Sequence, residues 1–276
     1  SGLVPIELKH IFRQSDLSFI HLLNNVRENR MDEQTLSALN KRCIPNFQPS
    51  EDEGYITLTT HNYQSQKINN TKLLELSTSI QRFQAKVEND FPEYMYPTDQ
   101  LLELKIGAQV MFVKNDSSYE KRYFNGKIGK VIDIDDEQIE VLCPDDSTSI
   151  MVSVDEWQNS KYSLNEKTQE IEEKVVGKFY QYPLKLAWSI TIHKSQGLTF
   201  EKAIIDARQS FAHGQVYVAL SRCKTLEGLV LSTPIENSSV KNDATVQGFS
   251  KHTEANQPDN KKLEESRKSY QLELLS

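Results

Sequence analysis

Two patterns of hydrophobicity alternate along this chain, and together they limit the folds it can adopt. Near both ends, short apolar stretches rich in β-branched residues alternate with amphipathic helical segments. Between them, at about 105–178, the pattern changes to short strands separated by turns. Alternating strands and helices predict a parallel sheet, whereas short strands joined by turns predict a small antiparallel barrel or sandwich. We therefore expect an α/β domain with an inserted β-domain.

The α/β part should begin with a helix for which Ser15 or Asp16 is a suitable N-cap. In chain order, the expected elements are that helix, a helix at about 32–43, a strand at 55–60, a helix at 64–76, a strand at 182–191, a helix beginning near Lys194, a strand at 203–206, a helix at 215–221 and a strand at 229–232. Parallel sheets bind ligands beyond the carboxyl ends of their strands. Thr60, and Asn62 in a polar loop at 61–63, should therefore lie where a ligand binds.

The inserted part should contain four strands, at 108–114, 127–134, 138–142 and 149–154. Asn125-Gly126 and Asp135-Asp136 are turn sequences and predict hairpins between them. Beyond Pro234 the chain has few apolar residues, so we expect much of 236–276 to be mobile, with helical character at 263–274.

The net charge of −7 on 276 residues would ordinarily count against nucleic-acid binding. The acidic residues, however, are concentrated: 133–173 contains thirteen Asp and Glu against two Lys, a net of −11, which leaves +4 for the rest. Three widely spaced cysteines argue against a disulfide framework and a zinc site, and we expect no metal site. No apolar run reaches the ~20 residues of a membrane span, so we expect an intracellular, cytoplasmic protein, associated with the nucleoid if bacterial.

Three segments, in this order, resemble motifs IV, V and VI of superfamily 1 DNA helicases of the PIF and RecD-like branch. They are residues 12–16 (FRQSD), 183–200 (PLKLAWSITIHKSQGLTF) and 214–222 (GQVYVALSR). A fourth stretch, 104–129, resembles the entry to the SH3-like barrel of that branch. The resemblance covers roughly 4–235, and it implies a RecA-like domain of the P-loop NTPase type in two parts, 1–104 and 179–235, around an inserted SH3-like barrel at 105–178, followed by a tail at 236–276.

The resemblance implies that Arg13 and Arg222 are arginine fingers, which reach the γ-phosphate of ATP held by another motor domain. A guanidinium suits this role because its fixed donors match the charge that develops on phosphoryl oxygens. The alternative for each is a surface arginine with a carboxylate partner. The resemblance also places Gln14, Gln196, Gly197 and Gln215 near the nucleotide.

The sequence T-I-H-K-S-Q-G places hydroxyl, imidazole and ammonium groups at a strand end, where they can bind phosphates without reading bases. By resemblance, the residues that face single-stranded DNA are Thr191, His193, Lys194 and Ser195, with Thr60 and Asn62 on the same path. His193 could instead be a core histidine, and Thr60 and Asn62 could be helix caps.

Residues 105–130 carry a net charge of +4, with Tyr119, Tyr123 and Phe124 interleaved. Basic and aromatic side chains suit a channel for single-stranded DNA, so Lys114 and Lys127 are also candidate DNA contacts. The alternative is an ordinary barrel with solvated lysines and core aromatics.

A phosphate loop of the form G-x-x-x-x-G-K-S/T does not occur in the sequence. We therefore expect ATP and Mg²⁺ to be held mainly by an N-terminal RecA-like domain of the same protein, upstream of residue 1, and the chain alone to be inactive. Its role would be that of the C-terminal motor half of a helicase, and the resemblance suggests 5′-to-3′ movement. A non-motor nucleic-acid-binding module is the alternative, and a helicase-derived nuclease or recombination subunit is a weaker third.

Overall fold

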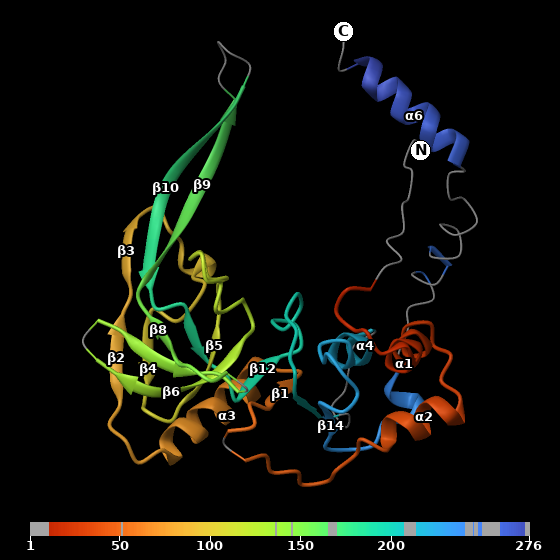
Figure 1. The fold of residues 1–276 in the computed structure, drawn as a ribbon, viewed down its shortest axis with the longest axis horizontal. Coiled ribbons are helices and arrows are strands. Elements are labelled where there is room, and N and C mark those ends of the chain that lie inside the picture. The colour runs from red at the N-terminus through yellow and green to blue at the C-terminus, as the bar shows by residue number, and fades with distance from the viewer. Residues whose placement is uncertain are drawn as a thin grey trace.

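The computed structural model describes residues 11–50, 52–135, 137–144, 146–164, 170–206, 214–240, 245, 248–249 and 260–273. Figure 1 shows a parallel sheet with helices beside a β-rich part, from which a long hairpin projects. None of the helices in these ranges is long and apolar enough to cross a membrane.

The first two helices begin where the sequence supplies caps. α1 (Leu17–Arg27) starts after Asp16, whose carboxylate accepts a hydrogen bond from the Ser18 amide, and α2 (Glu33–Asn40) starts after Asp32, which accepts one from the Thr35 amide. Such side chains satisfy amides that have no partner within the helix. Both predicted helices are confirmed.

The parallel sheet has the order β12-β1-β13-β14, in which every neighbouring pair is parallel. Its strands are β1 (Ile56–Thr59), β12 (Ser189–Thr191), β13 (Ala203–Ile205) and β14 (Leu229–Leu231). The strands predicted at 55–60, 203–206 and 229–232 are confirmed, as is the helix at 215–221, which is α4 (Gln215–Leu220). Strands from both ends of the chain thus form one sheet.

Three local predictions are wrong. The apolar run at 182–191 is two strands, β11 (Leu184–Leu186) and β12, in different sheets. The Gln109 side chain donates to the Ala187 carbonyl between them, and apolar side chains of both strands pack into cores, so the sequence reads as one largely apolar run. α3 (Asn62–Glu75) already begins at Asn62 rather than after a loop at 61–63, and residues near Lys194 form turns rather than a helix.

The β-rich part contains an antiparallel sheet of order β11-β5-β6-β7-β8. β5 (Gln109–Phe112), β6 (Ile128–Ile134), β7 (Ile139–Leu142) and β8 (Ile150–Val152) correspond to the four predicted strands. β6 and β7 pair as the hairpin expected near Asp135. β5 and β6 also pair, through a long loop at 113–127 that includes the predicted turn at 125–126, where the Lys127 amide donates to the Phe124 carbonyl at 3.0 Å.

The remaining strands were not predicted. β2 (Gln81–Gln84) pairs with β4 (Leu101–Leu104), and β3 (Lys86–Asn89) pairs with β10 (Ile171–Gln181), which forms the projecting hairpin with β9 (Asp155–Leu164). β2 and β3 are short and largely exposed, so they lack the alternating apolar residues by which strands are detected. The division at 105 and 178 remains a prediction. The described residues also include two 3₁₀ turns, Glu93–Met95 and Asn237–Ser239, and the helix α6 (Asn260–Glu273).

The buried apolar side chains of the described residues form two large cores and a small one. The parallel sheet and its helices bury one cluster around Phe19, Leu39 and Phe200, while the five-stranded sheet buries another around Phe112 and Leu184. A third, small cluster forms around Phe179 at the base of the hairpin. Met111 of β5 belongs to the first cluster although its neighbours in β5 belong to the second, so this strand joins the two parts.

Candidate functional site

Arg13 and Arg222, the two arginines singled out by the sequence, meet at the end of α4. Arg13 Nε donates to Thr199 Oγ1 at 2.9 Å, and its Nη1 donates to the Ser221 carbonyl at 3.2 Å. Arg222 Nη2 donates to Ser221 Oγ at 2.9 Å, and its Nε donates to the Val218 carbonyl at 3.0 Å. Residues separated by more than 180 positions therefore form one cluster.

This cluster has an excess of positive charge. In the described parts of the chain, neither arginine has an ion pair with a carboxylate, and the acceptors they contact are neutral. Arg222 is only 8% exposed. Burial, and then the charge of Arg13, lower the pKa of Arg222. Two neighbouring guanidinium groups without a carboxylate are costly by themselves and are suited to an anion.

Gln14 holds the segment before α1 against the end of α4. Its buried amide group donates to the carbonyls of Ser221 and Cys223, at 3.0 and 2.9 Å. Gln14 thus packs against the backbone that carries Arg222. Gln215 is the first residue of α4 and follows Gly214, whose φ of 75° is one that glycine adopts readily.

The second group of predicted residues lies where β1 and β12 end. These neighbouring strands pair in register, with Thr59 opposite Thr191, and the Ile192 amide donates to the Thr59 carbonyl at 2.8 Å. The residues that follow each strand therefore emerge at the same edge of the sheet, as expected for a ligand site.

The side chains in the loop after β12 divide into an exposed and a buried set. His193, Lys194 and Gln196 are exposed, so His193 is not a core histidine. Ser195 is fully buried and its hydroxyl donates to the Ile192 carbonyl at 2.7 Å, while Thr191 Oγ1 accepts from the Lys194 amide at 3.3 Å. The two hydroxyl groups thus shape the turn that presents the exposed set.

Gly197 ends this turn with a φ of 85° and open space where a Cβ would stand. Its backbone is therefore accessible. In the loop after β1, Thr60 Oγ1 lies 2.7 Å from His61 Nδ1, and Asn62 is exposed in the first turn of α3. His61 therefore lies between the predicted residues Thr60 and Asn62 at this edge of the sheet. Sequence reasoning treated it only as a loop residue, because a lone histidine has no motif around it.

The two predicted lysines of the β-rich part are held by partners within the chain. Lys114 Nζ binds Asp155 Oδ1 at 2.7 Å and lies 5.1 Å from the ring centre of Trp157. Lys127 Nζ binds Asp146 Oδ2 at 2.6 Å and the Arg122 carbonyl. The structure does not bring these lysines together with the edge of the parallel sheet through any contact among the described residues.

The loop 113–127 nevertheless approaches that edge. A Cβ at Gly126 would lie 3.4 Å from the Leu198 side chain, so the end of this loop packs on the turn after β12. Phe124 is half exposed, and Tyr119 is fully exposed. Exposed aromatic rings therefore belong to a loop whose base borders the predicted strand path.

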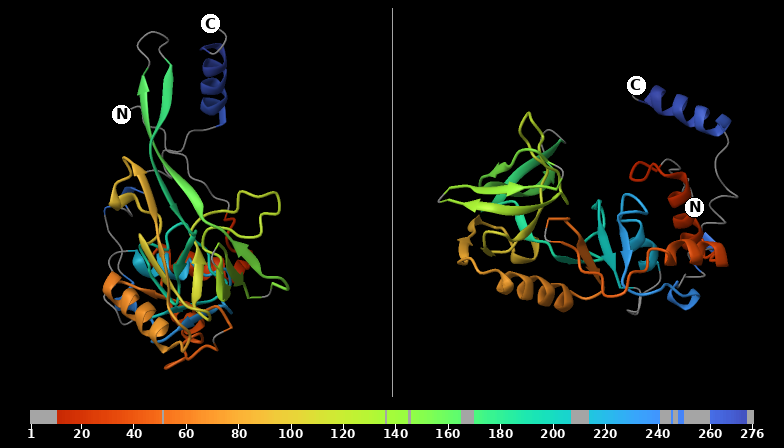
Figure 2. Two further views of the ribbon diagram at one scale, coloured as in Figure 1. Left: turned by 90° about the vertical axis from the view of Figure 1, so that its left-hand side faces the viewer. Right: turned by 60° about the horizontal axis from the view of Figure 1, so that its bottom comes forward.

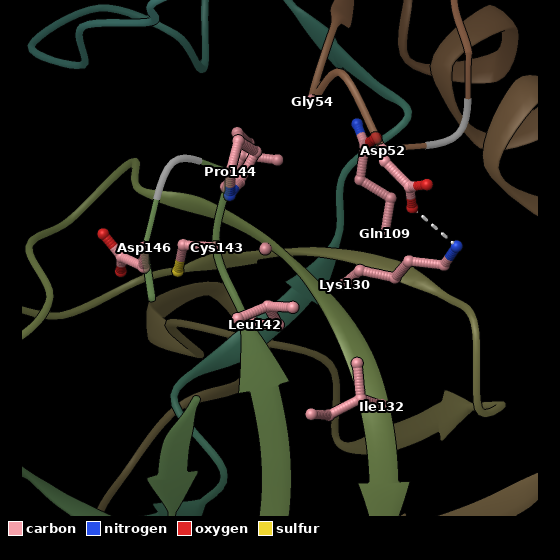
Figure 3. A pocket seen from close by; sticks show the side chains of 11 residues that line it. Asp52, Gly54, Gln109, Lys130, Ile132, Leu142, Cys143, Pro144 and Asp146 are labelled. Atoms are coloured by element: carbon pink, nitrogen blue, oxygen red, sulfur yellow. Dashed lines mark hydrogen bonds and ion pairs between the residues drawn. The ribbon is translucent and has the colours of Figure 1, made fainter. Parts of the chain in front are cut away.

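A separate cavity of about 350 Å³ lies between β6, β7 and the segment before β1. Figure 3 shows Asp52, Lys130 and Cys143 along it, with an ion pair of 2.9 Å between Asp52 and Lys130. Burial raises the pKa of the Cys143 thiol to about 11, which keeps it protonated and unreactive near neutral pH. The cavity contains none of the predicted site residues.

Comparison with known proteins identifies relatives. The ATP-dependent DNA helicase PIF1 of Homo sapiens is 34% identical over 82% of this chain, and the Pif1 helicase of Bdellovibrio bacteriovorus is 33% identical over 84%. The crystal structure of Bacteroides sp. Pif1 in complex with ADP-AlF4 superposes with a TM-score of 0.84 at 38% identity, over 92% of this chain. Bacteroides Pif1 bound to ssDNA gives 0.61 at the same identity, over 91%. No family model matches the chain.

These similarities, with the parallel sheet, define the class as a helicase domain with a RecA-like α/β fold. Within that class, the chain belongs to the Pif1 family of DNA helicases, and the predicted family is confirmed. The chain spans only part of its relatives: 34% of the human protein, 50% of the Bdellovibrio protein and 58% of the Bacteroides chain in the ADP-AlF4 complex.

Proposed function

We propose that the chain is the C-terminal motor half of an ATP-dependent DNA helicase. In this function, Arg13 and Arg222 reach the γ-phosphate of ATP bound by a RecA-like domain upstream in the same protein. The single observation that supports it best is the pair of adjacent guanidinium groups without a carboxylate partner in the described residues. An anion from outside the chain would balance this charge, and hydrolysis places such charge on the phosphoryl oxygens.

The same proposal makes the edge formed by β1 and β12 the grip for single-stranded DNA. His61, His193 and Lys194 are exposed there, and their donors can bind phosphates without reading the base sequence. Thr191 and Ser195 would act by holding the turn in shape, while Gln196 and the accessible Gly197 link the grip to the nucleotide.

Movement along the strand would follow from closure of the two motor domains around ATP and reopening after hydrolysis. The β-rich part would be the SH3-like barrel of the family and would take part in this cycle. The lower TM-score against the ssDNA-bound relative, at unchanged identity, supports a different arrangement of parts in that complex. ATP and Mg²⁺ would be held mainly by the upstream domain, since the printed sequence has no G-x-x-x-x-G-K-S/T.

The test is replacement of Arg222 in the full-length protein. Arg222→Ala should lower DNA-stimulated kcat for ATP hydrolysis by on the order of 10³-fold, while ssDNA affinity stays within about threefold. Arg222→Lys should lose nearly as much, because a single ammonium lacks the planar fork of donors. ATPase assays and fluorescence anisotropy on the same preparations measure both.

Arg82→Ala is the matched control, because Arg82 pairs with Glu103 in an exposed position on β2. It should leave kcat unchanged. Normal turnover in both Arg222 variants, with circular dichroism showing folded protein, would disprove the finger role. ssDNA binding without any DNA-stimulated ATPase in the unchanged full-length protein would favour a non-motor binding module. The 276-residue chain alone should neither hydrolyse ATP nor unwind DNA.

A further inference from the structure

Thr199 is a partly buried residue that the proposed function leaves without a role. Its Oγ1 accepts a hydrogen bond from Arg13 Nε at 2.9 Å, although the two residues lie 186 positions apart. The Arg13 guanidinium also contacts the Ser221 carbonyl, which accepts from Nη1 at 3.2 Å. Among the residues that the structure describes, Thr199 is therefore the only one whose side chain accepts from this arginine.

The backbone that carries Thr199 is fixed. Its neighbours in sequence, Leu198 and Phe200, are buried in the core of the parallel sheet. The Phe200 amide donates to the Arg222 carbonyl, and the Phe200 carbonyl accepts from the Lys224 amide, both at 2.9 Å. The Thr199 hydroxyl is therefore an acceptor on a segment that core packing and two backbone hydrogen bonds hold in place.

Arg13, in contrast, has a long side chain that must be oriented. It lies before α1, outside any helix or strand. Gln14 already attaches this segment to the end of α4, since its side chain donates to two carbonyls there. The hydrogen bond to Thr199 therefore acts on the guanidinium rather than on the course of the backbone. An arginine side chain has several rotatable bonds, so a guanidinium without this acceptor would adopt more orientations.

The nitrogen that Thr199 contacts is the one closest to the side-chain stem. A hydrogen bond at Nε fixes the plane of the guanidinium and leaves the two terminal nitrogens at its far end. The Ser221 carbonyl uses one N–H group of Nη1, and the other terminal N–H groups of Arg13 have no partner in the described parts of the chain. Donors that are oriented before the reaction stabilise charge on a phosphoryl group better than donors that must first reorganise.

We propose that Thr199 is a positioning residue for ATP hydrolysis, whose hydroxyl group orients the Arg13 guanidinium for the γ-phosphate. The inference rests on the proposed function, in which Arg13 is an arginine finger. It adds a residue that contacts neither the nucleotide nor the DNA and acts only through Arg13.

The test is the kinetics of ATP hydrolysis by the full-length protein at saturating ssDNA. Thr199→Val removes the hydroxyl group and keeps the shape of the side chain. It should lower kcat about tenfold, because a hydrogen bond to a charged group is lost, while KM for ATP stays within about twofold. Thr199→Ser should keep kcat within about twofold of the unchanged protein. The matched control is Thr148→Val, which removes an exposed contact of 3.2 Å between Arg122 Nη2 and Thr148 Oγ1 and should leave kcat unchanged.

A double-mutant cycle separates the orientation of Arg13 from a general effect on the fold. Arg13→Ala should lower the rate of hydrolysis by on the order of 10³-fold. In that background, Thr199→Val should change the single-turnover rate by less than about twofold, because the group that it orients is gone. A normal kcat in Thr199→Val, a tenfold loss in Thr199→Ser, or an equal loss from Thr199→Val in both backgrounds would overturn the inference and leave the proposed function intact. Normal turnover in folded Arg13→Ala would overturn the finger role of Arg13, and this inference with it.

Discussion

Single buried residues position the arginine cluster. Gln14 donates to two carbonyls at the end of α4, and Arg13 shares the Ser221 carbonyl with it. Interior hydrogen bonds of this kind contribute modestly when formed, but their loss would take the donor from the Cys223 carbonyl. The backbone on either side of Arg222 is therefore held by a neutral amide that itself need not contact ATP.

Gln14→Ala should lower the free energy of unfolding by about 1–3 kcal/mol, because the Cys223 carbonyl loses its donor while the Ser221 carbonyl keeps Arg13. Urea denaturation followed by circular dichroism measures this. Gln84→Ala, in an exposed position of β2, should change stability by no more than about 0.5 kcal/mol. Equal stability of the two variants would show that the carbonyls find other donors, or that Gln14 contributes little.

The sequence was sufficient to select Arg13 and Arg222, because each lies in an ordered motif, and the structure brings them together. It could not separate the exposed His193 and Lys194 from the buried Thr191 and Ser195. That division depends on the turn after β12, which replaces the predicted helix and directs two hydroxyl groups to the backbone. Local sequence cannot indicate which side of a turn faces solvent.

At the level of elements, the parallel sheet depends on close backbone contact between segments distant in sequence. A Cβ at Gly228 would lie 1.9 Å from the Glu201 carbonyl oxygen, just before β13 and β14 pair. The Gly228 carbonyl accepts from the Ala203 amide at 2.9 Å. Glycine is required here for space, since any side chain would push the two segments apart.

Gly228→Ala should therefore lower the free energy of unfolding by about 3 kcal/mol or more, since backbone must move to make room. Gly214→Ala is the comparison, because its Cβ would meet nothing within 4 Å and only the φ of 75° is unfavourable. That variant should lose about 1 kcal/mol. Thermal and urea denaturation should show Gly228→Ala to be less stable than Gly214→Ala. The reverse order would contradict the packing argument.

Element prediction succeeded where hydrophobic pattern and caps agreed, as in α1, β1 and β6, and failed where tertiary contacts decide. β2 and β3 have too few apolar residues to be recognised alone and form through their partners β4 and β10. The run at 182–191 is largely apolar because its apolar side chains pack into two cores, so its division between two sheets is not visible in the sequence.

Over the whole molecule, charge and core are distributed unevenly. Much of the acidic segment lies in β6, β7 and the hairpin of β9 and β10, which projects away from the parallel sheet (Figure 1). The strand-end edge thus carries histidine and lysine although the chain has a net charge of −7. α6 lies apart from the sheets in Figure 1 and in the right-hand view of Figure 2, and its side chains from 261 to 273 are exposed.

The boundary between the packed fold and the exposed helix should fall after Val240. Val240 is 8% exposed in the core, and Ile235 is 2% exposed and exchanges two hydrogen bonds with Asn40, of 3.0 and 2.8 Å. Deleting 241–276 should change the free energy of unfolding by no more than about 0.5 kcal/mol, because the described side chains of α6 bury nothing. Deleting 235–276 should cost about 3–5 kcal/mol, since two apolar side chains leave the core.

Urea denaturation of the two truncated proteins separates these cases, with tryptophan fluorescence and circular dichroism as independent probes. A large decrease in the free energy of unfolding after deletion of 241–276 would mean that α6 packs on the fold in solution. A small decrease after deletion of 235–276 would mean that the contact of Ile235 with Asn40 contributes little to stability. α1 and α2 pack on the same core as Ile235. Deleting 235–276 should therefore also destabilise the segment before α1, which carries Arg13, and so disturb the proposed catalytic cluster.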